Sequence, residues 1–443
     1  MELDLPSRWS LLRHHDLQQA YFHSSHRFNV VPAGRRSGKS ELAKRKVVKA
    51  AMLGSKFDNA RFFAAAPTYG QAKRIYWADL KALVPDWMKR GRPSESELVI
   101  PLINGSEIHV FGMDKPERIE GSPWDGGILD EYGNMKREAW GANVRPALSD
   151  RLGWCDLIGV PEGRNHYYDV AKTAESQMKE NRENSSWGYF HWFSSDILPP
   201  EEIEAARNEL DLLTFEQEYE GSFVSFEGRI YYPFISQTHT ASLKYDPKRE
   251  IAFCFDFNVE PGVAAIVQEQ ALPSGEVGSG VIGEVHIDRN SNTPAVCNRL
   301  IKDWQEHQGK IVCFGDATGG ARGSAKVMGS DWDLIKETLN PAFKGRISYE
   351  VPNSNPAERS RVNAVNSRLR SATGVIRLMV DGAKAPHVVK DLDGVVALKG
   401  GSGEIDKKAT PGLTHISDAL GYYIVKRFPV QTQAMRKIAM GGV

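Results

Sequence analysis

The alternation of apolar and polar positions divides the chain into two runs of short strands and helices. In the first run, apolar strings alternate with stretches of helical pattern, which predicts a mainly parallel α/β sheet with helices on both faces. Within this run, Asn104-Gly105 separates two apolar strings and predicts a β-hairpin. The apolar strings are 28–33, 61–66, 126–129 and 156–160, and the helical stretches are 39–52, 69–83 and 136–147.

The second run differs because its first strands follow one another with no helix between them. Its strings are 251–257, 263–268, 280–287 and 311–315. This order predicts a mixed α/β sheet that begins with antiparallel pairs. The predicted organisation is a first domain at 1–195, an acidic helical linker at 196–245, a second domain at 246–428 and a mobile tail at 429–443.

The composition is that of an ordinary globular protein. The 443 residues are enough for two cores, 41% of them are apolar, and 56 basic and 56 acidic residues give a net charge of zero. No apolar run reaches the roughly 18 residues that span a bilayer, and the amino end is not a signal peptide, so we expect a cytosolic protein without membrane contact. Four scattered cysteines without a CxxC pair exclude a secreted disulfide scaffold.

Charge is balanced in total but not along the chain. Residues 1–50 carry a basic surplus of six, residues 196–227 hold ten acids against one arginine, and residues 340–427 hold fourteen basic residues against eight acids. The last segment contains a run of arginines that is a candidate phosphate-contacting surface, with a solvated helix face as the equal alternative. These arginines are Arg359, Arg361, Arg368, Arg370 and Arg377.

A phosphate-binding loop is the strongest motif in the sequence. A predicted strand ends at Ala33, a glycine-containing loop follows, and a helix begins at Lys39-Ser40. In such a P-loop the backbone N–H groups wrap the phosphates of ATP, the lysine reaches the β- and γ-phosphates and the serine hydroxyl binds Mg²⁺. Ala33 stands where the motif usually begins with glycine. The predicted nucleotide-binding residues are Gly34, Arg35, Arg36, Ser37, Gly38, Lys39 and Ser40, of which the two arginines either sense charge or are merely solvated.

A second acidic motif fits the requirements of this loop. The short apolar string 126–129 ends in Asp130 and Glu131, which is typical of a Walker B motif. We expect Asp130 to orient Mg²⁺ and Glu131 to polarise the attacking water. Gln18, upstream of the P-loop strand, is a candidate reader of the adenine edge, although a surface glutamine is the commoner explanation.

Several motifs in order resemble those of the large terminase subunits of tailed bacteriophages. The loop at 33–40 resembles the Arg-containing P-loop of that family, and the hairpin at Asn104-Gly105 with 118–121 resembles the stretch before its Walker B motif. The segment 159–165 resembles the coupling motif, although Gly159 and Val160 replace the usual Ser or Thr. The segment 215–223 resembles the link into the family's nuclease domain.

The resemblance implies a fold, an activity and partners. It implies an ASCE-type P-loop ATPase domain followed by an RNase H-like nuclease domain, which together drive double-stranded DNA into a procapsid and cut concatemeric DNA. The implied partners are double-stranded DNA, the portal protein, the small terminase subunit and further copies in a ring, all in the host cell cytoplasm. Arg118 is a candidate for the arginine that one ring subunit supplies to its neighbour's γ-phosphate.

Three aspartates in the second half are candidates for a two-metal nuclease site. Asp256 interrupts an apolar strand string, Asp316 follows another, and Asp418 lies near the start of a helix, on the same side as His415. Carboxylates that hold two Mg²⁺ or Mn²⁺ ions are the simplest means of cutting DNA without sequence preference. An RNase H-like nuclease uses these same three positions. Glu284 and Asp333 are weaker candidates for a fourth carboxylate.

Two other functions share some of these features. A helicase-like DNA repair ATPase with a fused nuclease would carry both sites, but no further helicase motif follows residue 165. A nucleotide-regulated DNA-binding protein with an inactive RNase H-like domain is a non-enzymatic alternative, against which the intact aspartate trio argues.

Overall fold

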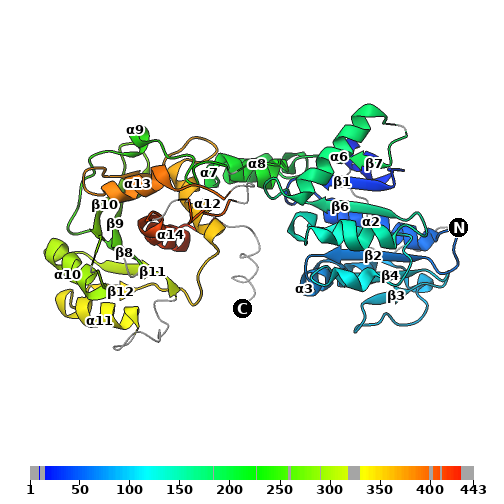
Figure 1. Cartoon of the computed structure of the whole chain (residues 1–443), viewed down its shortest axis with the longest axis horizontal. Coiled ribbons are helices and arrows are strands. Elements are labelled where there is room, and N and C mark those ends of the chain that lie inside the picture. The colour runs from blue at the N-terminus through cyan, green and yellow to red at the C-terminus, as the bar shows by residue number, and fades with distance from the viewer. Residues whose placement is uncertain are drawn as a thin grey trace. The chain divides into compact units, whose positions relative to one another are not determined.

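The computed structural model forms two compact units (Figure 1). One unit comprises the residues up to 203 together with 216–224, and the other comprises 204–215 together with the residues from 225 onward. The predicted linker is thus shared between the units, and most of the predicted tail, 431–443, lies outside the described residues. The structure describes residues 9, 15–182, 184–225, 227–257, 261–289, 291–317, 330–398, 403–409 and 412–430.

The first unit is built on a seven-stranded sheet of order β3-β4-β2-β5-β6-β1-β7. All neighbouring strands are parallel except β3 and β4, which form the predicted hairpin. Because β6 separates β1 from β5, the P-loop strand and the Walker B strand have the ASCE-type arrangement. The strands are β1 (Phe28–Pro32), β2 (Arg61–Ala66), β3 (Val99–Pro101), β4 (Glu107–Gly112), β5 (Gly126–Asp130), β6 (Trp154–Gly159) and β7 (Trp187–Tyr189).

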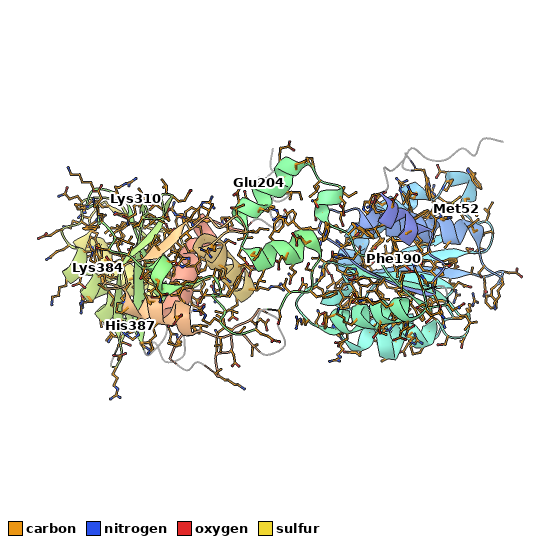
Figure 2. All side chains as sticks on the ribbon, turned by 90° about the horizontal axis from the view of Figure 1, so that it is seen from above. Met52, Phe190, Glu204, Lys310, Lys384 and His387 are labelled. Carbon is orange, nitrogen blue, oxygen red and sulfur yellow. The ribbon has the colours of Figure 1, made fainter. Side chains whose placement is uncertain are left out.

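Helices cover both faces of this sheet, as predicted. Successive residues of one strand point to opposite faces, and Val30 and Val31 belong to two different core clusters. Phe190, labelled in Figure 2, packs into the cluster that contains Val31. The helices are α1 (Asp16–Phe22), α2 (Lys39–Leu53), α3 (Tyr69–Ala72), α4 (Ala78–Leu83), α5 (Arg145–Ala147) and α6 (His166–Glu180), with π-helical turns at Lys73–Trp77 and Ala139–Val144.

The second unit has a six-stranded mixed sheet of order β12-β11-β8-β9-β10-β13. Its first three strands pair as an antiparallel meander, and β11 and β12 then extend the other side in parallel with β8. This is the strand arrangement of the RNase H-like fold, so the predicted fold class is confirmed for both halves. The strands are β8 (Ile251–Asp256), β9 (Gly262–Ala271), β10 (Val277–Ile287), β11 (Ile311–Gly315), β12 (Ile347–Tyr349) and β13 (Leu378–Val380).

Helix α14 packs on β8, β9 and β11 and also contacts α12 and α13. Its buried side chains belong to the same core cluster as Cys254 of β8 and Val365 of α12. None of the helices within the described ranges has the length and apolar character needed to cross a membrane. The remaining helices are α7 (Pro200–Glu209), α8 (Leu212–Glu220), α9 (Ser236–His239), α10 (Thr293–Trp304), α11 (Asp331–Ala342), α12 (Glu358–Leu369), α13 (Pro386–Gly394) and α14 (His415–Arg427).

Candidate functional site

The P-loop lies between the end of β1 and the start of α2, and neighbouring backbone packs closely against it. The N–H of Gly34 donates to Trp192 O at 3.1 Å, and the N–H of Arg35 donates to Glu218 O at 2.6 Å. A Cβ added to Gly34 would lie 2.3 Å from Tyr219 O. Gly34 is therefore required by close packing, and Gly38, with φ of 83°, supplies the left-handed turn into α2.

Side-chain hydrogen bonds to two carbonyl oxygens hold the loop. Ser37 Oγ donates to Gly34 O at 2.5 Å, and Lys39 Nζ donates to the same oxygen at 3.3 Å. Gln18 Nε2 and Trp192 Nε1 both donate to Ser37 O, at 2.8 and 2.9 Å. Gln18 is buried, and its amide nitrogen already serves the loop, so its reading of adenine remains a prediction that rests on its carbonyl oxygen.

The two loop arginines differ in their surroundings. Arg35 forms an ion pair through Nε with Glu218, a residue of α8. Arg36 is exposed and has a φ of 60°, a left-handed conformation that is strained for a non-glycine residue. Glu218 was not a predicted site residue, because the ion pair joins positions 183 residues apart in the sequence.

The predicted Walker B acids meet the P-loop directly. Ser40 Oγ donates to Asp130 Oδ2 at 2.7 Å, and Tyr76 Oη donates to the same oxygen at 2.9 Å. Asp130 is buried, and its Oδ1 accepts the N–H of Glu131 at 2.9 Å. Burial also raises the pKa of Tyr76, and the Asp130 carboxylate raises it further, which keeps this hydroxyl a donor. Tyr76 was missed because tyrosine in a helical pattern is usually a core residue.

Glu131 turns out of the strand in a left-handed conformation, with φ of 54°. Burial raises the pKa of the Glu131 carboxyl, and this effect outweighs the Lys39 ammonium, which lowers it. A partly buried carboxylate with a raised pKa beside a lysine is suited to accepting a proton from water.

The coupling-like segment contacts the loop that follows Glu131. Asn165 caps α6 by accepting from Tyr167 N at 2.9 Å, and its Nδ2 donates to Gly133 O at 2.9 Å. Gly163 N donates to Gln217 Oε1 at 3.1 Å. The segment 216–224 therefore touches both the P-loop and the coupling-like segment within the first unit.

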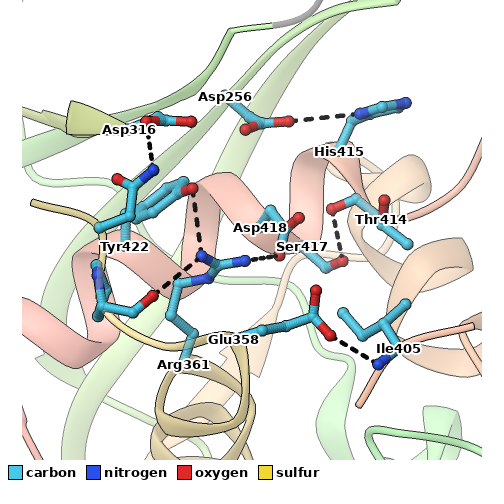
Figure 3. Close-up of polar contacts among 12 residues, drawn as sticks. Asp256, Asp316, Glu358, Arg361, Ile405, Thr414, His415, Ser417, Asp418 and Tyr422 are labelled. Carbon is cyan, nitrogen blue, oxygen red and sulfur yellow. Dashed lines mark hydrogen bonds and ion pairs between the residues drawn. The ribbon is translucent and has the colours of Figure 1, made fainter. Parts of the chain in front are cut away.

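The second unit brings the three predicted aspartates to one end of its sheet (Figure 3). Asp256 ends β8 and Asp316 follows β11, and these strands are parallel neighbours with Gly315 opposite Phe255. Asp418 lies in the first turn of α14. Burial raises the pKa of the Tyr422 hydroxyl, and Arg361 lowers it, while all three aspartates raise it further. All three carboxylates therefore act on this one hydroxyl.

Each of the three aspartates has a neighbouring donor of its own. Asp256 Oδ2 lies 3.4 Å from His415 Nδ1, Asn355 Nδ2 donates to Asp316 Oδ1 at 2.7 Å, and Arg361 Nη2 donates to Asp418 Oδ1 at 2.8 Å. Burial raises the pKa of Asp418, whereas Arg361 lowers it.

The donor set suits a hard divalent cation, because the oxygens of carboxylates are the ligands that Mg²⁺ and Mn²⁺ prefer. Across the ranges that the structure describes, however, no three His, Cys, Asp or Glu side chains converge closely enough, as they stand, to hold an ion. The three aspartates offer the ligand type that a metal site needs, and they lie at the same end of the sheet. Their side chains have to turn toward one another to hold an ion.

Comparisons with known proteins find similarity to one family over the first half of the chain. Residues 31–237 match the family model described as the N-terminal part of the T4likevirus-type terminase large subunit. Over this part, the chain is thus similar to the phage large terminases. It is 27% identical to the terminase large subunit of Thermus phage G20c in an alignment of 245 positions, which covers 49% of this chain and 50% of that protein. It is 26% identical to the large subunit of Escherichia phage T5 over 224 residues, 49% of each chain.

The chain spans about half the length of these curated terminase relatives. The similarity in fold to solved terminase structures covers more of the chain than the similarity in sequence does. A large terminase from a thermophilic bacteriophage matches 93% of this chain and 98% of its own chain, with a TM-score of 0.58 and 15% identity. Another structure of that thermophilic phage terminase, with ADP, matches with a TM-score of 0.58 and 16% identity. The predicted resemblance to the terminase family is confirmed.

The two weaker acidic candidates have local structural partners. Glu284 accepts from the backbone N–H groups of His387 and Val388, each at 3.0 Å, and so caps the start of α13. Asp333 forms a capping box with Ser330 at the start of α11. These contacts account for both carboxylates without a metal ion.

The predicted arginine surface is wrong for Arg361, which is buried against Asp418. A carboxylate on α14 faces this position of α12, and burial of the pair draws the guanidinium inward. Arg368 of the same helix forms an ion pair with Glu269 at 3.2 Å, and Arg377 Nη1 donates to Asn208 O at 2.9 Å. Arg118 is exposed in the 3-10 turn Pro116–Ile119, and its role toward a neighbouring subunit remains a prediction.

Proposed function

We propose that this chain is the subunit of a viral genome-packaging motor that hydrolyses ATP to move double-stranded DNA into a procapsid and cuts concatemeric DNA. The observation that carries the ATPase part is the hydrogen bond between Ser40 and Asp130, because it joins the P-loop to the end of the Walker B strand with Glu131 beside it. The match of residues 31–237 to the terminase family supports the packaging role.

In the proposed ATPase reaction, the backbone N–H groups of 36–39 bind the phosphates and Lys39 neutralises the charge of the γ-phosphate. Ser40 and Asp130 hold Mg²⁺, which offsets the charge that develops on the phosphate oxygens. Glu131 orients the attacking water and accepts its proton. Arg35 and Arg36 are the charge sensors of the loop, and Gln18 reads the adenine edge.

In the proposed nuclease reaction, Asp256, Asp316 and Asp418 hold two divalent ions. Mg²⁺ or Mn²⁺ there lowers the pKa of a bound water and stabilises the leaving oxygen. To hold the ions, the aspartates would turn away from their present partners. The RNase H-like order of strands supports this part of the proposal, because it brings the three acids to one end of the sheet.

The proposed partners follow from the terminase family: double-stranded DNA, the portal protein of the procapsid and the small terminase subunit, in the host cell cytoplasm. We further propose that several copies form a ring on the portal, in which Arg118 of one subunit approaches the γ-phosphate of the next.

The ATPase part is tested by the turnover of Lys39→Ala. Loss of this positive charge is expected to lower ATP hydrolysis by about 100-fold, the usual effect of removing one group that stabilises the transition state. Lys49→Ala is the matched control, because Lys49 is exposed on the same helix. Equal turnover of Lys39→Ala and the parent, both folded, would contradict the proposal.

The nuclease part is tested by plasmid nicking in Mn²⁺ with Asp256→Ala. The variant is expected to lose nicking while it keeps ATP turnover, because Asp256 lies in the other unit. Nicking at the parental rate would refute the metal role of Asp256. Absence of nicking in the parent would favour an inactive RNase H-like domain, and unwinding of a forked duplex without a capsid would favour a helicase-like enzyme.

A further inference from the structure

Arg361 of α12 is buried beside the three aspartates, and its side chain is 9% exposed against 10% for Asp418. Its guanidinium lies 4.6 Å from the centroid of the Tyr422 ring, and Nη1 donates to Tyr422 Oη at 3.3 Å. Nη2 makes the single hydrogen bond to Asp418 Oδ1 at 2.8 Å (Figure 3). The buried Nε of Arg361 has no acceptor among the described residues. The pair is thus monodentate, short of the two parallel hydrogen bonds that an arginine and a carboxylate can form.

Arg361 differs from the partners of the other two aspartates. Asn355 is neutral and His415 carries a side chain that can be neutral, whereas a guanidinium is always charged. We propose that Arg361 is an internal counter-ion that competes with a divalent cation for Asp418. The inference rests on the proposed nuclease function and adds to it a residue that sets the metal affinity of the site.

The physical reason is the sharing of one buried carboxylate by two cations. Without a metal ion, the guanidinium offsets the cost of burying the charge of Asp418. When a divalent ion approaches Asp418, the guanidinium repels it across a few ångströms of poorly screened protein. Asp418 therefore has to leave Arg361 before it binds the ion fully. A DNA phosphate offers the released guanidinium another anion, so bound DNA favours the metal-loaded state.

The test is the affinity of the full chain for Mn²⁺, measured without nucleotide by electron paramagnetic resonance of the free ion. Arg361→Gln keeps a hydrogen-bond donor but removes the charge, and we expect Mn²⁺ to bind at least about ten-fold more tightly. Arg361→Lys keeps the charge and is expected to stay close to the parent. Arg368→Gln is the matched control, because Arg368 lies on the same helix and pairs with Glu269, away from the aspartates. It is expected to leave Mn²⁺ affinity unchanged.

The opposite result would overturn the inference. If Arg361 only orients Asp418 for the metal, Arg361→Gln weakens Mn²⁺ binding by roughly 10–100-fold, as is usual for groups that support a metal ligand. If Arg361→Gln does not fold, Arg361→Met, which fills similar volume without charge, gives the same test.

A double variant tests whether Arg361 and the metal ion compete for Asp418 itself. In a protein that already carries Asp418→Asn, adding Arg361→Gln is expected to leave Mn²⁺ affinity unchanged. A ten-fold gain in affinity there would overturn the inference, because the competition would not be for Asp418. If Asp256→Asn binds Mn²⁺ as tightly as the parent does, the proposed nuclease site itself is refuted.

Discussion

Gly34→Ala tests whether the P-loop depends on close packing against the segments behind it. The added Cβ would lie 2.3 Å from Tyr219 O, 2.4 Å from Ser194 Oγ and 2.7 Å from Ser194 N. Two of these atoms are backbone, so the loop itself has to shift. Overpacking of this kind costs about 1–3 kcal/mol. For a unit of roughly 200 residues each kcal/mol lowers Tm by about 2–4 °C, so we expect a decrease of about 2–12 °C.

The assay pairs calorimetric unfolding with binding of a fluorescent ATP analogue. Gly34→Ala is expected to lower the Tm of the first unit and to weaken nucleotide binding, because Ser37 and Lys39 both donate to Gly34 O. Gly70→Ala is the control: Gly70 lies in α3 with no atom within 4 Å of an added Cβ, and alanine there is expected to be neutral or stabilising. A Gly34→Ala protein that melts and binds nucleotide as the parent does would refute the packing argument.

Two further predictions concern the first unit. Glu131→Gln is expected to lower ATP turnover by about 10²–10⁴-fold with little change in nucleotide affinity, because it removes the base but not the phosphate contacts; equal losses in both, measured by turnover and direct binding, would contradict this. Arg151→Ala is expected to destabilise the unit by about 3–5 kcal/mol in urea unfolding, since it leaves the buried Asp125 without its charged partner at 2.7 Å. Arg137→Ala, which breaks an exposed pair with Asp169, is expected to cost less than about 1 kcal/mol, and equal losses from the two variants would refute the role of burial.

Local pattern was enough to predict most strands of both sheets but missed β7, β12 and β13, which are three residues long each. Strand strings bounded by loops, and the glycine-containing turn before Lys39, depend on residues close in sequence. The antiparallel start of the second sheet followed from the absence of helices between its first three strings. The three aspartates were found by a related argument, because a carboxylate that ends an apolar string has little structural reason to be there.

Contacts between distant segments were not predictable in this way. Glu218 and Gln217 lie beside the P-loop and the coupling-like segment only because 216–224 packs with the first unit. In the sequence, the acids of 216–224 follow a helical pattern that is typical of a solvated face. Glu218 meets its partner Arg35 through the fold. Its position could be inferred only once the fold had placed the two segments together.

The error at Arg361 shows why charge counts along a sequence do not define a surface. Val365 lies four residues after Arg361 on the same side of α12 and is buried, so the periodicity of the helix already places Arg361 on an inward face. Pairing with Asp418 removes one charge of each sign and leaves the basic surplus of 340–427 unchanged. The surplus therefore has to be carried by other residues of the segment. Arg370 and Lys426 are exposed, and we expect the phosphate contacts of the second unit to lie among residues of this kind.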